Sequence, residues 1–349
     1  MRKKIICLAL ALTLVLAGCG TGTDTNKVQT KDNIRIGISI YDGYDTFITD
    51  MANELSNYAK NKEKETGKTI LLDVVSANGS QLTQNDQVAK FIDKQYDVVA
   101  VNLVDRTDAT VIIDKAKNAS VPVVFFNREP VNEDLNRWEG LYYVGANAEQ
   151  SGALQAELVN KALGNPLRFK QIDRNGDGII QYVILEGETG HQDALIRTQV
   201  SIEQIQQAGY AIEKLGDEIA NWNRSQAMSK MNLLLEEYPT EIEMVIANDD
   251  DMALGAIDAF DAGETELPLV VGINGTDDAL EAIKMKKMAG TVYNDARGQA
   301  KAIMEQAISL ATEGTASPLC DFDENGAYYV DYKLIEYENV QDYIRLKGQ

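Results

Sequence analysis

Short apolar runs alternate with longer amphipathic stretches along the chain from about residue 34. The runs are "IRIGISIY", "TILLDVV", "DVVAVNLV", "VPVVFF", "LYYVGAN", "QYVILEG", "IEMVIAN" and "LPLVVGIN", and stretches with helical spacing separate them. Uninterrupted apolar strands joined by helices are typical of parallel sheets with helices on both faces. The strands are too many for one comfortable doubly wound sheet, so the pattern predicts two α/β lobes.

Polar residues gather where these strands end. Asp45, Asn102, Asn127 and Asn294 follow strands, as do the segments "EGETGHQD", "ANDDD" and "NGTDD". Ligands of doubly wound sheets bind outside the carboxyl ends of the strands. One polar strand end would indicate only a turn or a helix N-cap. Seven of them predict a constructed binding site.

The N-terminus is typical of an exported protein. "MRKK" is a basic segment, and a short apolar run follows it up to Gly18. The run is too short for a membrane span and indicates a cleaved signal over residues 1–18. "LAGC" resembles the bacterial lipobox, which implies cleavage before Cys19 and a lipid on its thiol, so the protein would be extracytoplasmic and membrane-anchored. An ordinary signal with an unrelated cysteine is the alternative. The polar residues 19–32 would form a flexible tether.

Composition narrows the class of partner. The 349 residues carry a net charge of -21, which disfavours nucleic acid and anionic membrane surfaces as partners. With Cys7 in the signal and Cys19 at the lipid site, Cys320 remains alone in an exported chain, so no intramolecular disulfide is expected.

A calcium-like loop begins at "DRNGDG". Asp173, Asn175 and Asp177 alternate and Gly178 allows a sharp turn, as in calcium loops. The twelfth position, which is a Glu in a helix–loop–helix site, is Ile184 here. After Gly178 the sequence "IIQYVILEG" is typical of a strand, so the twelfth residue is carried away from the metal. The loop still offers the carbonyl of Ile179 and the side chain of Gln181, and it needs one more carboxylate. A metal-free turn is the alternative.

The chain resembles the periplasmic sugar-binding proteins of transport systems, most closely the D-galactose/D-glucose-binding type. The resemblance rests on "IGISIYDGYDTF", "NLVD", "VPVVFFNREP", the calcium-like loop, "GETGHQDALIRT", "VIANDDDMALGA" and "AGTVYNDARGQA", in the family's order. It implies two similar doubly wound lobes joined by three strand crossings near residues 141, 295 and 328. The N-terminal lobe would comprise 33–141 and 295–327, and the C-terminal lobe 142–294 and 328–349. Hinge closure would trap one sugar between them.

The resemblance also implies the partners and the site. The protein would be a monomeric, non-enzymatic receptor that delivers a monosaccharide to the membrane subunits of an ABC importer. A membrane chemoreceptor or sensor kinase is an additional candidate partner. The implied sugar-binding residues are Asp45, Phe47, Asn102, His191, Asp193, Arg197, Trp222, Asp249, Asn274 and Asn294. Planar polar side chains suit pairs of adjacent hydroxyls, and Phe47 and Trp222 suit the apolar faces of a pyranose. Asp45 as a mere N-cap, Trp222 or Phe47 as core, and His191 as a structural residue are the plainer interpretations.

Two positions depart from the galactose/glucose pattern. Asp249 stands where that type has Asn, and Asn274 stands where it has Asp. The exchange preserves total charge but moves a donor, because an ionised Asp can only accept. Glucose or galactose is the first expectation, and a related aldose is the alternative.

In the resembled family a Glu before a distant strand completes a structural calcium site. Glu243 occupies that position here, and Glu241 is the nearby alternative. The implied set is then Asp173, Asn175, Asp177, Ile179, Gln181 and Glu243.

Two other classes of function compete with a receptor. A glycosidase could use paired carboxylates such as Asp45 and Asp193. A sugar-responsive transcription regulator would need a basic N-terminal helix-turn-helix, and the signal and tether stand in its place.

Overall fold

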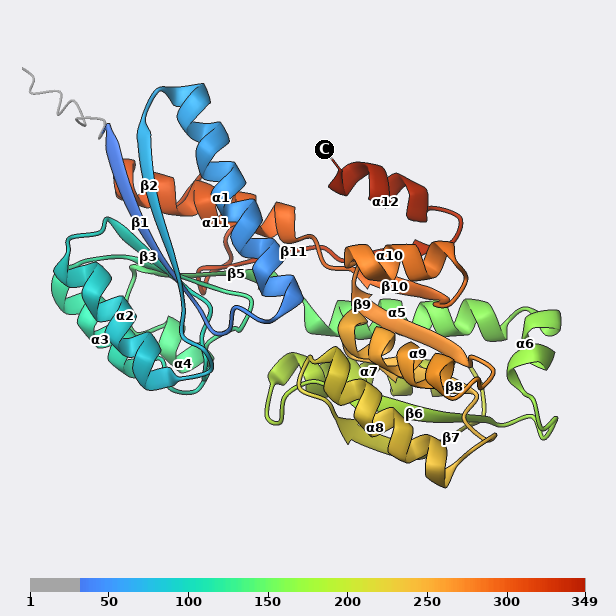
Figure 1. Cartoon of the computed structure of the whole chain (residues 1–349). Coiled ribbons are helices and arrows are strands. Elements are labelled where there is room, and N and C mark those ends of the chain that lie inside the picture. Colours follow the sequence, from blue (N-terminus) through green and yellow to red (C-terminus); the bar gives the residue numbers. More distant parts are fainter. Residues whose placement is uncertain (1–31, 349) are drawn as a thin grey trace, which may run out of the picture. The chain divides into compact units, whose positions relative to one another are not determined.

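The computed structural model describes residues 32–348, which form two six-stranded sheets (Figure 1). The signal, Cys19 and nearly all of the tether lie outside the described residues. The first sheet has the order β11-β5-β4-β3-β1-β2 and the second β12-β10-β9-β8-β6-β7. The strands of the first sheet are β1 (Asn33–Ile40), β2 (Thr69–Ser76), β3 (Val98–Val101), β4 (Val123–Phe126), β5 (Leu141–Ala146) and β11 (Ala327–Val330). Those of the second are β6 (Ile180–Glu186), β7 (Ile212–Ile219), β8 (Met244–Ala247), β9 (Leu269–Asn274), β10 (Gly290–Tyr293) and β12 (Lys333–Glu336).

Helices connect the strands and cover the sheets. The first lobe contains α1 (Thr46–Thr66), α2 (Gln81–Asp93), α3 (Thr110–Ala119), α4 (Asn132–Leu135) and α11 (Ala296–Glu313). The second contains α5 (Ala148–Leu163), α6 (Pro166–Ile172), α7 (Gln192–Gln207), α8 (Arg224–Glu237), α9 (Asp250–Ala262), α10 (Asp277–Lys284) and α12 (Val340–Lys347). The prediction of two doubly wound α/β lobes is confirmed.

Each sheet has a hydrophobic core on both faces. In the first lobe, one core joins the sheet to α1 and α11, and the other joins it to α2 and α3. The central strand β4 shows the alternation: Phe125 belongs to one core and Phe126 to the other, and both are fully buried. In the second lobe, α8, α9 and α10 cover one face, while α5, α6 and α7 cover the other. Burial on both faces explains why these strands are apolar runs without polar alternation.

Two of the three crossings between the sheets fall slightly later than expected from the sequence, and the other falls close to its expected position. β5 pairs with β4 along Leu141–Val144 and with β11 along Tyr143–Ala146, so the first crossing follows Ala146 instead of residue 141. β11 keeps the chain in the first sheet through Val330, beyond the expected residue 328. The return to the first lobe follows Tyr293, where β10 ends. The shifts arise because strand pairing continues to the end of each apolar run.

One strand departs from the parallel arrangement. β12 runs antiparallel to β10 at the edge of the second sheet, whereas the other pairings are parallel. None of the helices within residues 32–348 is both long enough and apolar enough to cross a membrane.

Candidate functional site

A cavity of about 30 Å³ lies where strands from both sheets end. Its lining comprises Tyr41, Asp45, Phe47, Asn127, Arg128, His191, Asp193, Arg197, Trp222, Asp249, Asn274 and Asn294. All the proposed sugar-binding residues except Asn102 are among them. The residues come from the segments that follow β1, β4, β6, β7, β8 and β10, together with the last residue of β9. The carboxyl ends of the strands thus form one site, as expected for doubly wound sheets.

Asp45 serves both as a helix cap and as part of the lining. Its Oδ1 accepts from the N–H of Ile48 at 2.9 Å and thereby caps α1. Its Oδ2 accepts from the Tyr41 hydroxyl at 2.6 Å. Burial raises the pKa of the Asp45 carboxyl, and these hydrogen bonds oppose that rise. The carboxylate is therefore fixed in direction while it faces the cavity.

Phe47, two residues further along α1, also has two roles. It is 7% exposed and belongs to the core beneath α1, yet it lines the cavity. The core therefore holds the ring in place as an apolar wall of the site.

Asn102 is not among the residues that line the cavity, and its role in the site stays a prediction. Its side chain is fully buried, where Oδ1 accepts from the N–H of Tyr41 at 3.2 Å and Nδ2 donates to Oδ1 of Asn127 at 3.0 Å. These bonds tie the ends of β1, β3 and β4 together. Asn127 and Arg128, which the sequence analysis did not assign to the site, line the cavity next to it. Their signal in the sequence is their position directly after "VVFF".

Arg128 is a buried residue that the sequence analysis did not assign to the site. Its guanidinium lies 3.6 Å from the centre of the Tyr41 ring, and it donates to Glu188 at 2.7 Å and to the carbonyl of Val104 at 2.8 Å. Glu188 follows β6 in the second lobe, so Arg128 links the two lobes at the edge of the cavity.

The start of α7 contributes three polar side chains. His191 is the N-cap residue, Asp193 lies in the first turn, and Arg197 lies one turn further. Arg197 is 5% exposed and donates to the carbonyl of Asn248 and to the Tyr332 hydroxyl, both at 3.0 Å. Its terminal nitrogen is 3.7 Å from Asp193. These contacts hold the guanidinium rigidly with its charge balanced.

His191 is a neutral imidazole in this setting. Burial lowers its pKa well below the usual range, and the nearby Arg128, Arg197 and Arg106 lower it further. A neutral imidazole has one donor and one acceptor nitrogen, which matches a hydroxyl group.

Trp222 forms an aromatic wall of the second lobe. Its ring contacts that of His191 edge-on, with centroids 5.0 Å apart. Gly187 leaves room for it, since a Cβ there would lie 2.0 Å from the indole. Trp222 has φ +58°, a left-handed conformation that costs energy for a bulky residue. Strained backbone conformations of this kind are concentrated at functional sites. Here the strained residue places its indole in the lining of the cavity.

Asp249 and Asn274, the two positions that depart from the galactose/glucose pattern, line the cavity together with Asn294. Asp249 caps α9 by accepting from the N–H of Met252 at 2.8 Å. Burial, followed by the neighbouring carboxylate of Asp251, raises the pKa of Asp249 well above its usual range. Asn294 donates to Oδ1 of Asn274 at 3.3 Å. Ligand hydroxyls that donate to Asp249 would relieve its burial penalty.

Three buried nitrogens in the lining are left for a ligand. Nε of Arg128, Nδ1 of His191 and Nε of Arg197 have no hydrogen-bond partner within residues 32–348. Buried polar atoms are normally paired, so these atoms point to an absent partner. Carboxylates, amides, a guanidinium and a neutral imidazole between Phe47 and Trp222 suit a small ring that carries several hydroxyls.

The loop at 173–181 is organised around its own oxygens. Asp173 accepts from the N–H groups of Gly176 and Gly178, and Asn175 and Gln181 both donate to Asp177 at 3.1 Å. Gly178 has φ +80°, which the sharp turn requires.

Glu243, the residue directly before β8, contacts this loop. It accepts from the N–H groups of Arg174, Asn175 and Gln181 at 2.6, 3.4 and 3.2 Å, and it is 1% exposed. Glu241 instead is exposed and accepts from Thr240. Among residues 32–348, no cluster of three or more Asp, Glu, His or Cys side chains could hold a metal by itself. The expected set also counts amide and carbonyl oxygens, and the donors present fit the all-oxygen preference of calcium.

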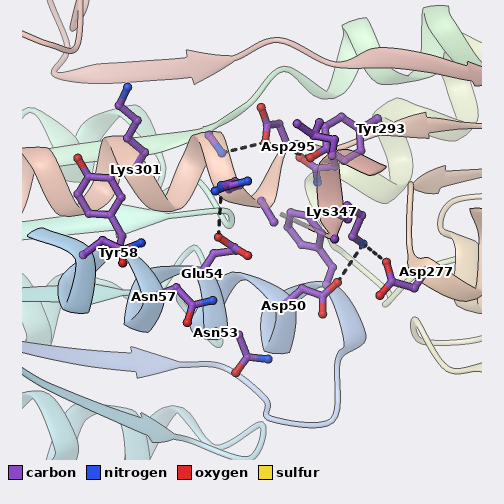
Figure 2. Close-up of a pocket in the computed structure, with 18 of the residues that line it drawn as sticks. Asp50, Asn53, Glu54, Asn57, Tyr58, Asp277, Tyr293, Asp295, Lys301 and Lys347 are labelled. Atoms are coloured by element: carbon purple, nitrogen blue, oxygen red, sulfur yellow. Dashed lines mark hydrogen bonds and ion pairs between the residues drawn. The ribbon is translucent and has the colours of Figure 1, made fainter. Parts of the chain in front are cut away.

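A larger cavity of about 890 Å³ adjoins the small one and shares Phe47, Asn274 and Asn294 with it. Figure 2 shows charged residues of its lining, which lie on α1, at the start of α10, around the start of α11 and at the end of α12. Several of those residues form ion pairs: Lys347 with Asp50 and Asp277, and Arg297 with Glu54. The small cavity, with its unpaired buried atoms, is the better candidate site.

Two doubly wound lobes with a polar and aromatic cavity at their strand ends define a two-lobed ligand-binding protein. The chain belongs to the family of the periplasmic binding protein domain, which matches residues 36–316.

Individual relatives fit this assignment. The chain is 36% identical over 318 residues to the D-galactose/methyl-galactoside binding periplasmic protein of Haemophilus influenzae, covering 89% of this chain and 92% of that one. It is 33% identical to a putative rhizopine-binding protein of Rhizobium meliloti, covering 80% and 84%. Among solved structures it is similar to an ABC transporter solute binding protein from Bacillus halodurans with bound myo-inositol, at 30% identity and a TM-score of 0.74, covering 90% and 98%. The protein is accordingly a binding protein and not an enzyme.

Proposed function

We propose that this protein is the extracytoplasmic receptor of an ABC importer and captures a monosaccharide between its two lobes. The observation that carries the proposal is the cavity at the strand ends. There Asp45, Asp193, Arg197 and Asp249 line the cavity together with the aromatic side chains of Phe47 and Trp222. The relatives support the same class of ligand, because they bind galactosides or cyclic polyols by their descriptions.

Glucose or galactose is the proposed ligand. The Haemophilus influenzae relative, which binds galactose, supports this choice. The exchanged pair Asp249 and Asn274 points to altered hydroxyl preference at one end of the site, so a related aldose or a cyclic polyol is the second candidate. The bound myo-inositol of the Bacillus halodurans protein favours including polyols.

A lipid on Cys19 would anchor the receptor outside the cell membrane. The proposal rests on "LAGC" and on the polar segment 19–32 that would separate anchor from lobes. Replacement of Cys19 by Ser should release the protein from the membrane fraction into the medium. Retention of the Cys19→Ser variant in that fraction would contradict the anchor. A further role of the sugar-bound protein would be to present the sugar to a membrane chemoreceptor or sensor kinase.

Calcium would stabilise the second lobe and take no part in sugar binding. The ligands would be the side chains of Asp173, Asn175, Asp177, Gln181 and Glu243 with the carbonyl of Ile179. The support is the position of Glu243, whose carboxylate reaches the loop from a strand more than sixty residues away in the sequence.

Calorimetric titration of the full-length protein in detergent with a panel of aldoses and cyclic polyols tests the receptor function. We expect saturable one-site binding of one member of the panel and no chemical change in the sugar. The Arg197→Lys variant should bind much more weakly, because Lys cannot reproduce a bidentate guanidinium contact. No heat with any member would refute the sugar site, and release of free sugar from glycosides would refute the receptor.

A further inference from the structure

The small cavity continues into a polar groove between the lobes. A second cavity, of about 390 Å³, shares Arg128, His191 and Asp193 with the small one. A third, of about 440 Å³, shares Arg106, Glu129 and Gln192 with the second. We refer to the second and third cavities together as the side groove. Its walls come from segments after β3 and β4 and from the region of β11 in the first lobe, and from residues 188–193, which include the start of α7, in the second.

Three buried atoms of the groove's lining residues have no hydrogen-bond partner within the described part of the chain. They are Nε of Arg128, Nδ1 of His191 and Oε1 of Gln192. Arg128 is only 6% exposed, so its Nε–H is shielded from bulk water as well. Two nitrogens and an amide oxygen together can satisfy hydroxyl groups, which both donate and accept. Buried polar atoms that are unpaired carry a free-energy cost unless a ligand or water meets them.

The other extension of the small cavity has no such atoms. The residues that line the cavity of about 890 Å³ contribute none of the unpaired buried side-chain atoms found in residues 32–348. Lys347 and Arg297 there are already in ion pairs. Hydrogen-bonding capacity is therefore concentrated on the side of Arg128 and Gln192.

Charge and shape in the side groove indicate the chemistry of its occupant. The second cavity is lined by two arginines and by four carboxylates, Asp105, Glu129, Glu188 and Asp193. Arg128 is paired with Glu188, and Arg106 donates to the carbonyl of Glu129. The excess of carboxylates disfavours an anionic group such as a sugar phosphate.

The third cavity, at the other end of the side groove from the small cavity, has an aromatic side chain in its lining. Tyr329 lines the third cavity, is 41% exposed, and donates its hydroxyl to Glu129 at 2.6 Å. A ring that is fixed at its hydroxyl end and exposed on its side can stack on the apolar face of a sugar.

From these observations we infer that the side groove is a second subsite that takes an uncharged sugar ring linked to the ring in the small cavity. In addition to the proposed monosaccharide, the protein would then bind a neutral disaccharide that contains it. This inference rests on the proposed function and deepens it. The first ring of the disaccharide would lie between Phe47 and Trp222. The linkage would pass Arg128 and His191, and the second ring would contact Gln192 and Tyr329.

Titration of the full-length protein with the preferred monosaccharide and with neutral disaccharides that contain it tests the subsite. We expect at least one disaccharide to bind about tenfold more tightly than the monosaccharide, as one or two added hydrogen bonds predict. The Gln192→Ala variant should lower disaccharide affinity about fivefold and leave monosaccharide affinity unchanged. Gln204→Ala, at an exposed position of the same helix α7, is the matched control and should change neither.

The outcomes separate the two proposals. Binding of the monosaccharide with exclusion of all disaccharides would overturn the subsite and leave the receptor function intact. Equal loss of both affinities in Gln192→Ala would mean that Gln192 only positions His191, which also overturns the subsite. Absence of binding for every sugar would refute the receptor function itself.

Discussion

Lys347, near the C-terminus, reaches across to Asp50 on the first lobe, with Nζ 3.5 Å from Oδ2 (Figure 2). The same nitrogen lies 2.9 Å from Asp277 at the start of α10 and 3.1 Å from the carbonyl of Gly275. Asp50 belongs to α1 and the other partners to the second lobe, so one ammonium group bridges the lobes beside the ligand cavity. An ion pair of this kind favours the closed arrangement over the open one.

The first prediction is that Lys347→Ala weakens ligand binding slightly. The pair is partly exposed, so it contributes at most about 1 kcal/mol, which corresponds to about a fivefold change in affinity. The effect should shrink in high salt, because salt screens exposed charges. Calorimetry at two ionic strengths measures both. Lys284→Ala removes a lysine whose partner, Glu281, lies in the same helix, and it should leave affinity unchanged. An equal effect of both variants would contradict the bridge.

The second prediction concerns the loop at 173–181. Chelation of calcium should lower the melting temperature by roughly 5 to 10 °C, since a ligand that binds only the folded state stabilises it. Glu243→Gln should melt at the temperature of the chelated protein and stop responding to chelator. Glu241→Gln is the matched control, because Glu241 does not touch the loop and should respond as the unmodified protein does. Superimposable melting curves with and without chelator would exclude the metal.

The sequence predicts the strands that are buried on both faces, and with them the strand-end site. β7 was missed because it lies at a sheet edge and half of its residues are charged, as in "IEKLGDEI". Nothing in its composition separates it from a loop, and only pairing with β6 defines it. The edge strand β12 is short and was missed for a similar reason.

The site was predicted by residue type and by position after a strand, and that rule does not say which of two neighbouring strand ends lines the cavity. Asn102 and Asn127 both follow strands, and their side chains bond to one another. Asn127 lines the cavity, whereas Asn102 lies behind it in this structure. The backbone conformation of Trp222 could not be predicted from the sequence either, because its left-handed φ depends on the surrounding fold. Arg128 could have been suspected from its place after "VVFF", but its pairing with Glu188 is a contact between lobes.

The third prediction concerns the exchanged pair. Asp249→Asn should weaken binding of the preferred ligand about tenfold or more, since hydrogen bonds to charged groups contribute about 1.5 to 3 kcal/mol. Adding Asn274→Asp restores the total charge in the arrangement of the galactose/glucose type. The double variant should therefore bind glucose or galactose better than either single variant does. A double-mutant cycle by calorimetry measures this coupling, and strictly additive effects would contradict it.

The fourth prediction is a pH dependence of stability that arises at Asp250. This carboxyl is fully buried at the start of α9 and accepts from the N–H of Thr276 at 2.8 Å and from the Thr291 hydroxyl at 2.6 Å. Burial raises its pKa from 3.8 to about 6, although these hydrogen bonds oppose the rise. Between these two values the folded state binds more protons than the unfolded state, so stability falls as pH rises.

The ionised Asp250 therefore lowers the free energy of unfolding at pH 7, by on the order of 3 kcal/mol relative to pH 4. Asp250→Asn cannot ionise and should lack this contribution. The difference in unfolding free energy between the two proteins, measured by urea denaturation from pH 4 to pH 7, should change steadily between pH 4 and pH 6 and level off above. The unmodified protein should gain relative to the variant as pH falls. Parallel curves across the range would mean that the fold does not penalise the Asp250 charge, because the Thr276 and Thr291 bonds then offset its burial completely.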